Sequence, residues 1–124
     1  MNNRAAQIVD IGDGTRENCF VVSENGEELF KIHYPDSVIR KFFETQHGYL
    51  LFFHSKALVS KEKSCLCLCS FDGRIKWWGD DGEGYQKGYF GVHMDGDSII
   101  AYDGEYNCKI DPETGKVVDR EFFK

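Results

Sequence analysis

The stretch that decides the fold is residues 67–77, CLCSFDGRIKW, in which an apolar strand is followed by a polar turn ending in glycine and by a second strand. The same order occurs at residues 19–30, CFVVSENGEELF, and at residues 107–118, NCKIDPETGKVV. Glycine suits the end of such turns because it adopts positive φ at no steric cost. The turn glycines, which are 47 and 42 residues apart, are Gly26, Gly73 and Gly115. The chain therefore contains three copies of one antiparallel unit.

Apolar and polar residues alternate over most of the chain, which is typical of short strands. The sequence predicts strands at Gln7–Ile11, Asn18–Ser23, Glu27–His33, Tyr49–His54, Ser64–Ser70, Arg74–Trp78, Tyr89–His93, Ser98–Tyr102, Tyr106–Ile110 and Lys116–Asp119. They make one all-β domain, residues 1–124, with repeats at about 7–33, 38–78 and 89–123. Residues 37–44 fit either a strand or a short helix capped by Asp36 or Ser37, because their apolar residues stand at 38, 39, 42 and 43.

A repeat of forty-odd residues with four short strands per unit is typical of β-propeller blades. The chain resembles the quinoprotein-like family of propeller repeats, whose blades end in a segment of the form D-x-x-T-G-K-x-x-W. Residues 111–116, DPETGK, match this segment, and residues 72–77, DGRIKW, match a blade end including its tryptophan. In the third copy Asp119 stands near the family's tryptophan position. The resemblance implies architecture alone, and no quinone-cofactor or calcium-site residue carries over.

Three units cannot close a propeller ring, which needs about four to eight blades. We therefore expect about three antiparallel, blade-like sheets in an open half-propeller or a related curved assembly. Its exposed edges must be covered by charges or by residues 36–44, or else pair with a partner. We expect a monomer when the chain is alone, or a 1:1 heterodimer with its partner.

The composition indicates a folded domain, with 124 residues, 41% hydrophobic and 29% charged. The net charge of −6 argues against nucleic-acid binding, because phosphate backbones need a surplus of Lys and Arg. No apolar run is long enough to cross a bilayer, and no signal-peptide core follows Met1, so we expect a cytoplasmic protein. Residues 1–78 hold ten basic and ten acidic residues, whereas residues 79–124 hold five basic and eleven acidic ones. The whole excess lies in the C-terminal third.

Most acids of this third adjoin glycines in short turns, and aromatic residues flank the first of these turns. The candidate partner-binding residues are Trp78, Asp80, Asp81, Glu83, Tyr85, Tyr89, Asp95, Asp97, Asp103 and Glu105. Carboxylates around aromatic anchors suit a contact with an Arg/Lys-rich protein. Two plainer interpretations stay open. The acids would be solvated turn residues, and Trp77 and Trp78, which point to opposite faces of a strand, would pack between sheets.

Five cysteines, an odd number, exclude a fully paired disulfide framework. Cys65, Cys67 and Cys69 alternate along a predicted strand, where neighbours on one face are about 7 Å apart, a poor fit to one tetrahedral metal ion. The pattern predicts a buried strand that packs small, soft side chains. The four histidines are scattered. We therefore expect no metal site and no cofactor.

No hydrolase, metalloprotease, phosphate-loop or deaminase motif occurs, so we expect no enzyme. A small acidic all-β chain of this kind is most economically a binder, and by profile it is similar to immunity proteins of contact-dependent growth-inhibition toxin systems. That similarity implies an inhibitor that covers the active site of a basic, nuclease-type toxin domain. Two alternatives stay open: a scaffold or subunit that completes a larger β assembly, and a carboxylate-dependent small-ligand or metal-binding protein.

Overall fold

The structure is a computed structural model that describes residues 3–12, 17–35, 37–54, 65–80 and 88–122. Within these residues the all-β prediction is confirmed, because the strands form three antiparallel sheets and no helix occurs. The N-terminal sheet contains β1 (Arg4–Asp10), β2 (Asn18–Glu24) and β3 (Glu27–Ile32). The central sheet contains β4 (Ile39–Thr45), β5 (Gly48–Phe53), β6 (Leu66–Cys69) and β7 (Ile75–Trp78). The C-terminal sheet contains β8 (Gly91–Asp95), β9 (Ser98–Tyr102), β10 (Tyr106–Ile110) and β11 (Val117–Phe122).

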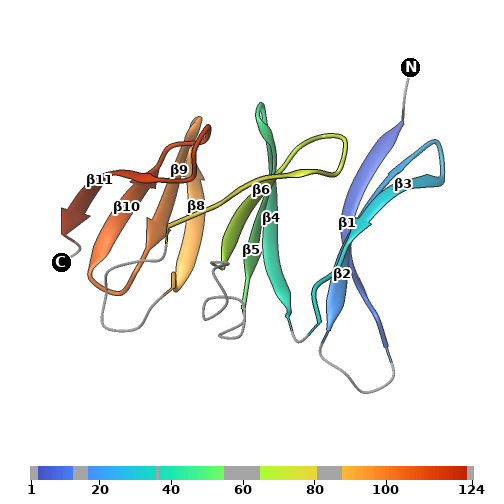
Figure 1. The fold of residues 1–124 in the computed structure, drawn as a ribbon, viewed down its shortest axis with the longest axis horizontal. Coiled ribbons are helices and arrows are strands. Elements are labelled where there is room, and N and C mark those ends of the chain that lie inside the picture. Colours follow the sequence, from blue (N-terminus) through green and yellow to red (C-terminus); the bar gives the residue numbers. More distant parts are fainter. Residues whose placement is uncertain (1–2, 13–16, 36, 55–64, 81–87, 123–124) are drawn as a thin grey trace.

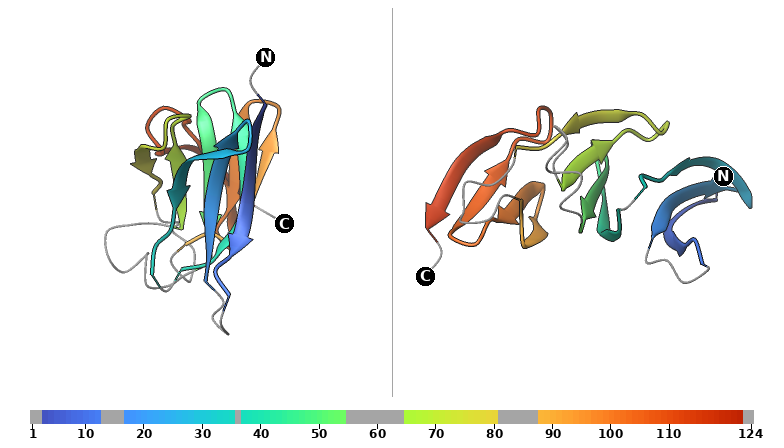
Figure 2. Two further views of the ribbon diagram at one scale, coloured as in Figure 1. Left: turned by 90° about the vertical axis from the view of Figure 1, so that its right-hand side faces the viewer. Right: turned by 60° about the horizontal axis from the view of Figure 1, so that its bottom comes forward.

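Each sheet is an up-and-down meander, in which strands that are neighbours in sequence pair with each other. The three sheets lie side by side in chain order, with the two termini at opposite ends of the row (Figure 1). The row is curved rather than straight (Figure 2). The first strands β1, β4 and β8 lie on the inner side of this curve, and the last strands β3, β7 and β11 lie on its outer side.

The helix alternative for residues 37–44 is wrong, because Ile39–Thr45 form strand β4, which pairs antiparallel with β5. Two features explain the helix-like spacing. The register shifts between Ile39 and Lys41, so a bulge interrupts the alternation. Moreover, Phe42 and Phe43 pack into different apolar layers on opposite faces of the central sheet. The ten strands predicted elsewhere are all present, with ends displaced by at most three residues.

Two apolar layers, one on each face of the central sheet, form the core. Along β5, Tyr49 and Leu51 face the N-terminal sheet, while Leu50 and Phe52 face the C-terminal sheet. The layer under the N-terminal sheet contains Phe20, Val22, Ile32, Ile39, Tyr49, Leu51, Phe53, Cys67 and Cys69. The layer under the C-terminal sheet contains Leu50, Phe52, Cys65, Leu66, Leu68, Trp77, Tyr89, Val92, Ile99, Ala101, Cys108 and Ile110. Burial on both faces explains why β5 and β6 are apolar at every position.

Adjacent sheets meet at their last strands through a turn glycine that lies on an aromatic ring. Gly73, between β6 and β7, lies on Phe30 of β3, and a Cβ there would be 2.8 Å from Cγ of that ring. Gly115, between β10 and β11, lies still closer to the indole of Trp77. The indole Nε1–H also donates to the carbonyl of Pro112 at 2.8 Å. Glycine is required at both turns because φ is positive and because the ring occupies the space of a side chain.

The two ends of the row differ at the equivalent positions. Phe30 and Trp77 each follow their own turn glycine by four residues, and the corresponding residue of the C-terminal sheet is Asp119, which is exposed. At the other end Gly26 also has a positive φ, as the other two turn glycines do, but nothing lies within 4 Å of its Cβ position. The described N-terminal sheet also has three strands where the other two sheets have four. At the C-terminal end of the row the position of the ring is therefore occupied by the Asp119 carboxylate. At the N-terminal end the turn glycine, Gly26, has no ring packed on it.

Candidate functional site

Seven of the ten candidate partner-binding residues lie in the described part of the chain, while Asp81, Glu83 and Tyr85 lie outside it. Four of the seven are exposed: Asp80, Asp95, Asp97 and Glu105. The other three contribute to packing: Trp78, Tyr89 and Asp103. The two groups therefore have different structural roles.

Asp103 is fully buried at the turn between β9 and β10. Its Oδ1 accepts hydrogen bonds from the backbone N–H groups of Glu105 at 2.9 Å and Tyr106 at 2.8 Å. These bonds close the turn, which is the usual role of an aspartate that accepts from residues two and three positions on. Cys108 Sγ lies 3.7 Å from the other carboxylate oxygen. In this structure the carboxylate thus serves the turn and presents no surface to a partner.

Trp77 and Trp78 both pack between sheets, on opposite faces of β7, as the plainer interpretation predicts. Trp78 is half-buried in the layer under the N-terminal sheet, with ring centroids 5.4 Å from Tyr34 and 5.8 Å from Phe53. Tyr89 is buried in the other layer, and its backbone N–H donates to Sγ of Cys65 at 3.2 Å. Burial is the main cause that raises the pKa of the Tyr89 hydroxyl far above its ordinary range.

Asp80 joins the central sheet to the C-terminal sheet. Its backbone N–H donates to the carbonyl of Gly115 at 3.0 Å, and its Oδ2 accepts from the N–H of Val117 at 3.0 Å. Both partners lie at the start of β11. The backbone of Asp80 therefore holds the turn glycine over Trp77, and its solvent-exposed carboxylate binds the first residue of β11.

The remaining exposed candidates lie at both ends of β9. Asp95 and Asp97 flank the β8–β9 turn, and Glu105 lies at the β9–β10 turn. A strand of five residues separates these turns by about 17 Å, so the three acids do not form a single compact cluster. They belong instead to a sheet that is acidic throughout, because residues 88–122 hold eight acidic and three basic residues.

Among the described residues, two grooves lie between the central and C-terminal sheets. One, of about 200 Å³, lies at the β4–β5 and β8–β9 turns, where Glu44, His47 and Asp97 line it. Within the described residues no group of three or more His, Cys, Asp or Glu is arranged to hold a metal ion. The other groove, of about 370 Å³, is lined by basic and aromatic residues, including Arg40, Lys41 and Phe90. None of the candidate residues predicted from the sequence lines this second groove.

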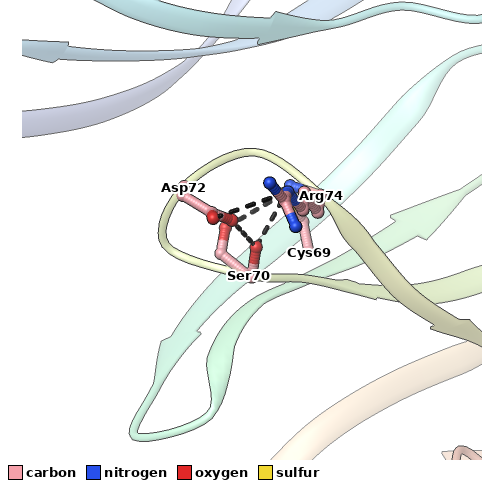
Figure 3. Close-up of polar contacts among 4 residues, drawn as sticks. All are labelled: Cys69, Ser70, Asp72 and Arg74. Carbon is pink, nitrogen blue, oxygen red and sulfur yellow. Dashed lines mark hydrogen bonds and ion pairs between the residues drawn. The ribbon is translucent and has the colours of Figure 1, made fainter.

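The five cysteines are free and buried, as predicted for the 65–69 strand. Burial raises the pKa of Cys67 well above its usual value. Burial, and then the charge of Asp72, raise the pKa of Cys69 to about 12. Figure 3 shows the turn that holds this carboxylate: the Ser70 hydroxyl donates to Asp72, and Arg74 Nε lies 3.7 Å from Asp72 Oδ2. The hydrogen bond from the Ser70 hydroxyl is the largest cause that lowers the pKa of Asp72. Because the pKa values of the two thiols are raised and that of the acid is lowered, the thiols stay protonated while the Asp72 carboxylate is ionised.

No protein-family model, no curated protein and no solved structure matches this chain. No helix long and apolar enough to span a membrane occurs in the portion of the chain that the structure describes.

Proposed function

We propose that the protein is a non-enzymatic binding module whose C-terminal sheet docks on a basic protein domain, in the manner of an immunity protein that covers the active site of a nuclease-type toxin. The observation that carries this proposal is the charge distribution. Residues 1–78, which form the N-terminal and central sheets, have no net formal charge, whereas the sheet formed by residues 88–122 has five more acidic than basic residues. The largest acidic surplus of the three sheets therefore sits at the C-terminal end of the row (Figure 1).

The surplus is available to a partner because most of its carboxylates are exposed. Asp95 and Asp97 stand on a tight turn, and Asp119 and Glu121 alternate along β11, so that they share one face of the sheet. A surface with a surplus of acidic groups raises the rate at which an oppositely charged protein associates. Such association slows as ionic strength rises, because salt screens exposed charges.

The test is binding of a toxin domain encoded beside the gene, measured by calorimetry and by association kinetics at several salt concentrations. Asp95→Lys/Asp97→Lys is expected to weaken binding at least tenfold, mainly through slower association. Glu27→Lys/Glu28→Lys is the matched control, because it changes the net charge equally on an exposed strand of the N-terminal sheet, at the other end of the row. Equal losses for the two double variants, or no loss for either, would contradict a role for the C-terminal sheet.

A second candidate function, a subunit of a larger β assembly, is favoured by the N-terminal end of the row. There the described sheet has three strands. An aromatic ring packs on Gly73 and on Gly115, whereas nothing lies within 4 Å of the Cβ position of Gly26. We propose that this end receives a further antiparallel sheet whose last strand carries an aromatic residue, in continuation of the two existing interfaces. A second copy of the chain lacks such a residue, because Asp119 stands at that position.

This geometry is tested by supplying the missing ring. Asp119→Trp is expected to make the protein self-associate head to tail, as measured by light scattering against concentration, and adding Gly26→Val is expected to reverse the association. Glu121→Trp is the control, because it adds the same side chain two residues further along the same face of β11. A monomeric Asp119→Trp variant, or equal association of both tryptophan variants, would refute the proposed contact.

A further inference from the structure

The groove of about 370 Å³ between β4 and β8 gathers three basic side chains, Arg40, Lys41 and His93, at an aromatic wall. The wall consists of Phe52 from the central sheet and of Phe90 and Tyr102 from the C-terminal sheet. No acidic residue lines this groove, so it is not part of the surface proposed to bind a basic protein. Its volume lies at the lower end of the range for small-molecule sites.

A backbone irregularity brings the two strongest cations together. Adjacent strand residues normally point to opposite faces, but the register of β4 against β5 shifts between Ile39 and Lys41. As a result both cations lie toward the C-terminal sheet. The guanidinium carbon of Arg40 lies 5.4 Å from the ring centroid of Phe52, and Lys41 Nζ lies 5.8 Å from that of Phe43. Bulges commonly redirect side chains in this way next to functional sites.

These cations have no carboxylate partner among the described residues, since the ion pairs found there involve other side chains. They are instead held over ring faces, which attract a cation but leave its N–H donors free. Two adjacent cations with free donors suit a phosphate group, which accepts several charge-assisted hydrogen bonds at once.

The aromatic wall is fixed in place although it is open to solvent. Phe90 is 51% exposed, its ring centroid lies 6.4 Å from that of Tyr102, and its backbone N–H donates to the Tyr102 carbonyl at 2.7 Å. The Tyr102 hydroxyl in turn donates to the carbonyl of Gly104 at 2.8 Å, and the Phe90 ring lies against Gly104. Gly91 adds open space, because nothing lies within 4 Å of its Cβ position. A planar ring can therefore stack here without rearrangement of the protein.

We propose that this groove binds a nucleoside monophosphate, with the phosphate at Arg40 and Lys41 and the base against Phe90. The volume suits one nucleotide rather than a strand of nucleic acid, in accordance with the acidic character of the rest of the chain. The groove is lined by none of the exposed carboxylates of the C-terminal sheet, so the proposed site does not depend on the proposed partner.

The test is calorimetric titration of the full chain with adenosine monophosphate, with adenosine and with inorganic phosphate. The monophosphate is expected to bind at least tenfold more tightly than either part. Arg40→Gln/Lys41→Gln is expected to weaken the monophosphate and phosphate alike at least tenfold, whereas Phe90→Ala weakens the monophosphate and leaves phosphate unchanged. Lys76→Gln/Lys109→Gln, which removes two exposed cations outside the groove, is the control and is expected to bind as the wild type does.

Gly91→Leu provides an independent test, because its φ is not in the left-handed region and its side chain would fill the groove without backbone strain. It is expected to abolish binding of the monophosphate while the thermal unfolding midpoint is retained. The proposal is overturned by absence of binding at millimolar monophosphate, by wild-type affinity of Arg40→Gln/Lys41→Gln, or by preference for an acidic peptide over the nucleotide. Asp95→Lys/Asp97→Lys should leave nucleotide affinity unchanged, so failure of one proposal does not imply failure of the other.

Discussion

Substitution of alanine for two turn glycines separates the cost of backbone conformation from the cost of the glycine-on-ring contact. Gly26 and Gly115 have φ of 86° and 77°, so each Cβ costs about 1–2 kcal/mol through left-handed backbone strain. Gly26 has nothing within 4 Å, so Gly26→Ala should cost no more than this. At Gly115 the added Cβ overlaps the Trp77 indole, and overpacking adds about 1–3 kcal/mol. Gly115→Ala should therefore cost about 2–5 kcal/mol.

The assay is equilibrium unfolding in urea, in which each variant is compared with the wild type at unchanged m value. Trp77→Leu removes the indole and supplies the second arm of a double-mutant cycle. In that background Gly115→Ala should cost only the backbone part, about 1–2 kcal/mol. Equal losses for Gly26→Ala and Gly115→Ala, or a Gly115→Ala loss that Trp77→Leu does not reduce, would refute the role of the ring.

Three further predictions concern buried polar groups. Tyr49→Phe should leave stability unchanged or raise it by up to about 1 kcal/mol in urea unfolding, because the buried Tyr49 hydroxyl has no hydrogen-bond partner among the described residues. Asp103→Ala should cost about 2–4 kcal/mol in the same assay, because two backbone N–H groups lose their acceptor, whereas exposed Asp97→Ala should stay within about 0.5 kcal/mol. The Cys69 pKa is about 12 in the folded chain, against an ordinary 9.0, so between these pH values the unfolded thiol loses its proton first. The free energy of unfolding should therefore fall as pH rises through that window, and Cys69→Ala should make the fall less steep.

The strands were predictable because period-two alternation and turn glycines are local signals. Gly73, for example, has a positive φ and marks the turn between β6 and β7. Residues 37–44 were ambiguous because tertiary structure changed the signal. Because the strand is buried on both faces, the consecutive residues Phe42 and Phe43 are both apolar. The bulge after Ile39 also interrupts the alternation of apolar and polar residues. Sequence periodicity identifies a strand with one buried face much more reliably than a strand with two.

The charge excess was predictable as a property of a region, but the role of each acid was not. Asp97 and Asp103 both stand beside a glycine in a turn, yet the first is exposed and the second is fully buried. The difference arises because the Asp103 carboxylate accepts two backbone hydrogen bonds, which depend on where the chain after it runs. The Arg40–Lys41 pair was missed for a similar reason. Two consecutive cations on a strand normally diverge, and only the bulge directs them to one groove.

The different ends of the row of sheets constrain how the protein can associate. A sheet packed on the outer face of the C-terminal sheet would bury Asp119, and burial of an unpaired carboxylate is strongly unfavourable. A partner at that end must therefore supply cationic groups that stay hydrogen-bonded to the carboxylates, which favours a basic protein surface over another apolar sheet. At the other end Gly26 has no charge to satisfy and has room for a ring. We therefore expect association through charges at the C-terminal end and association through an aromatic ring at the N-terminal end. Salt should weaken association at the C-terminal end and leave association at the N-terminal end largely unaffected.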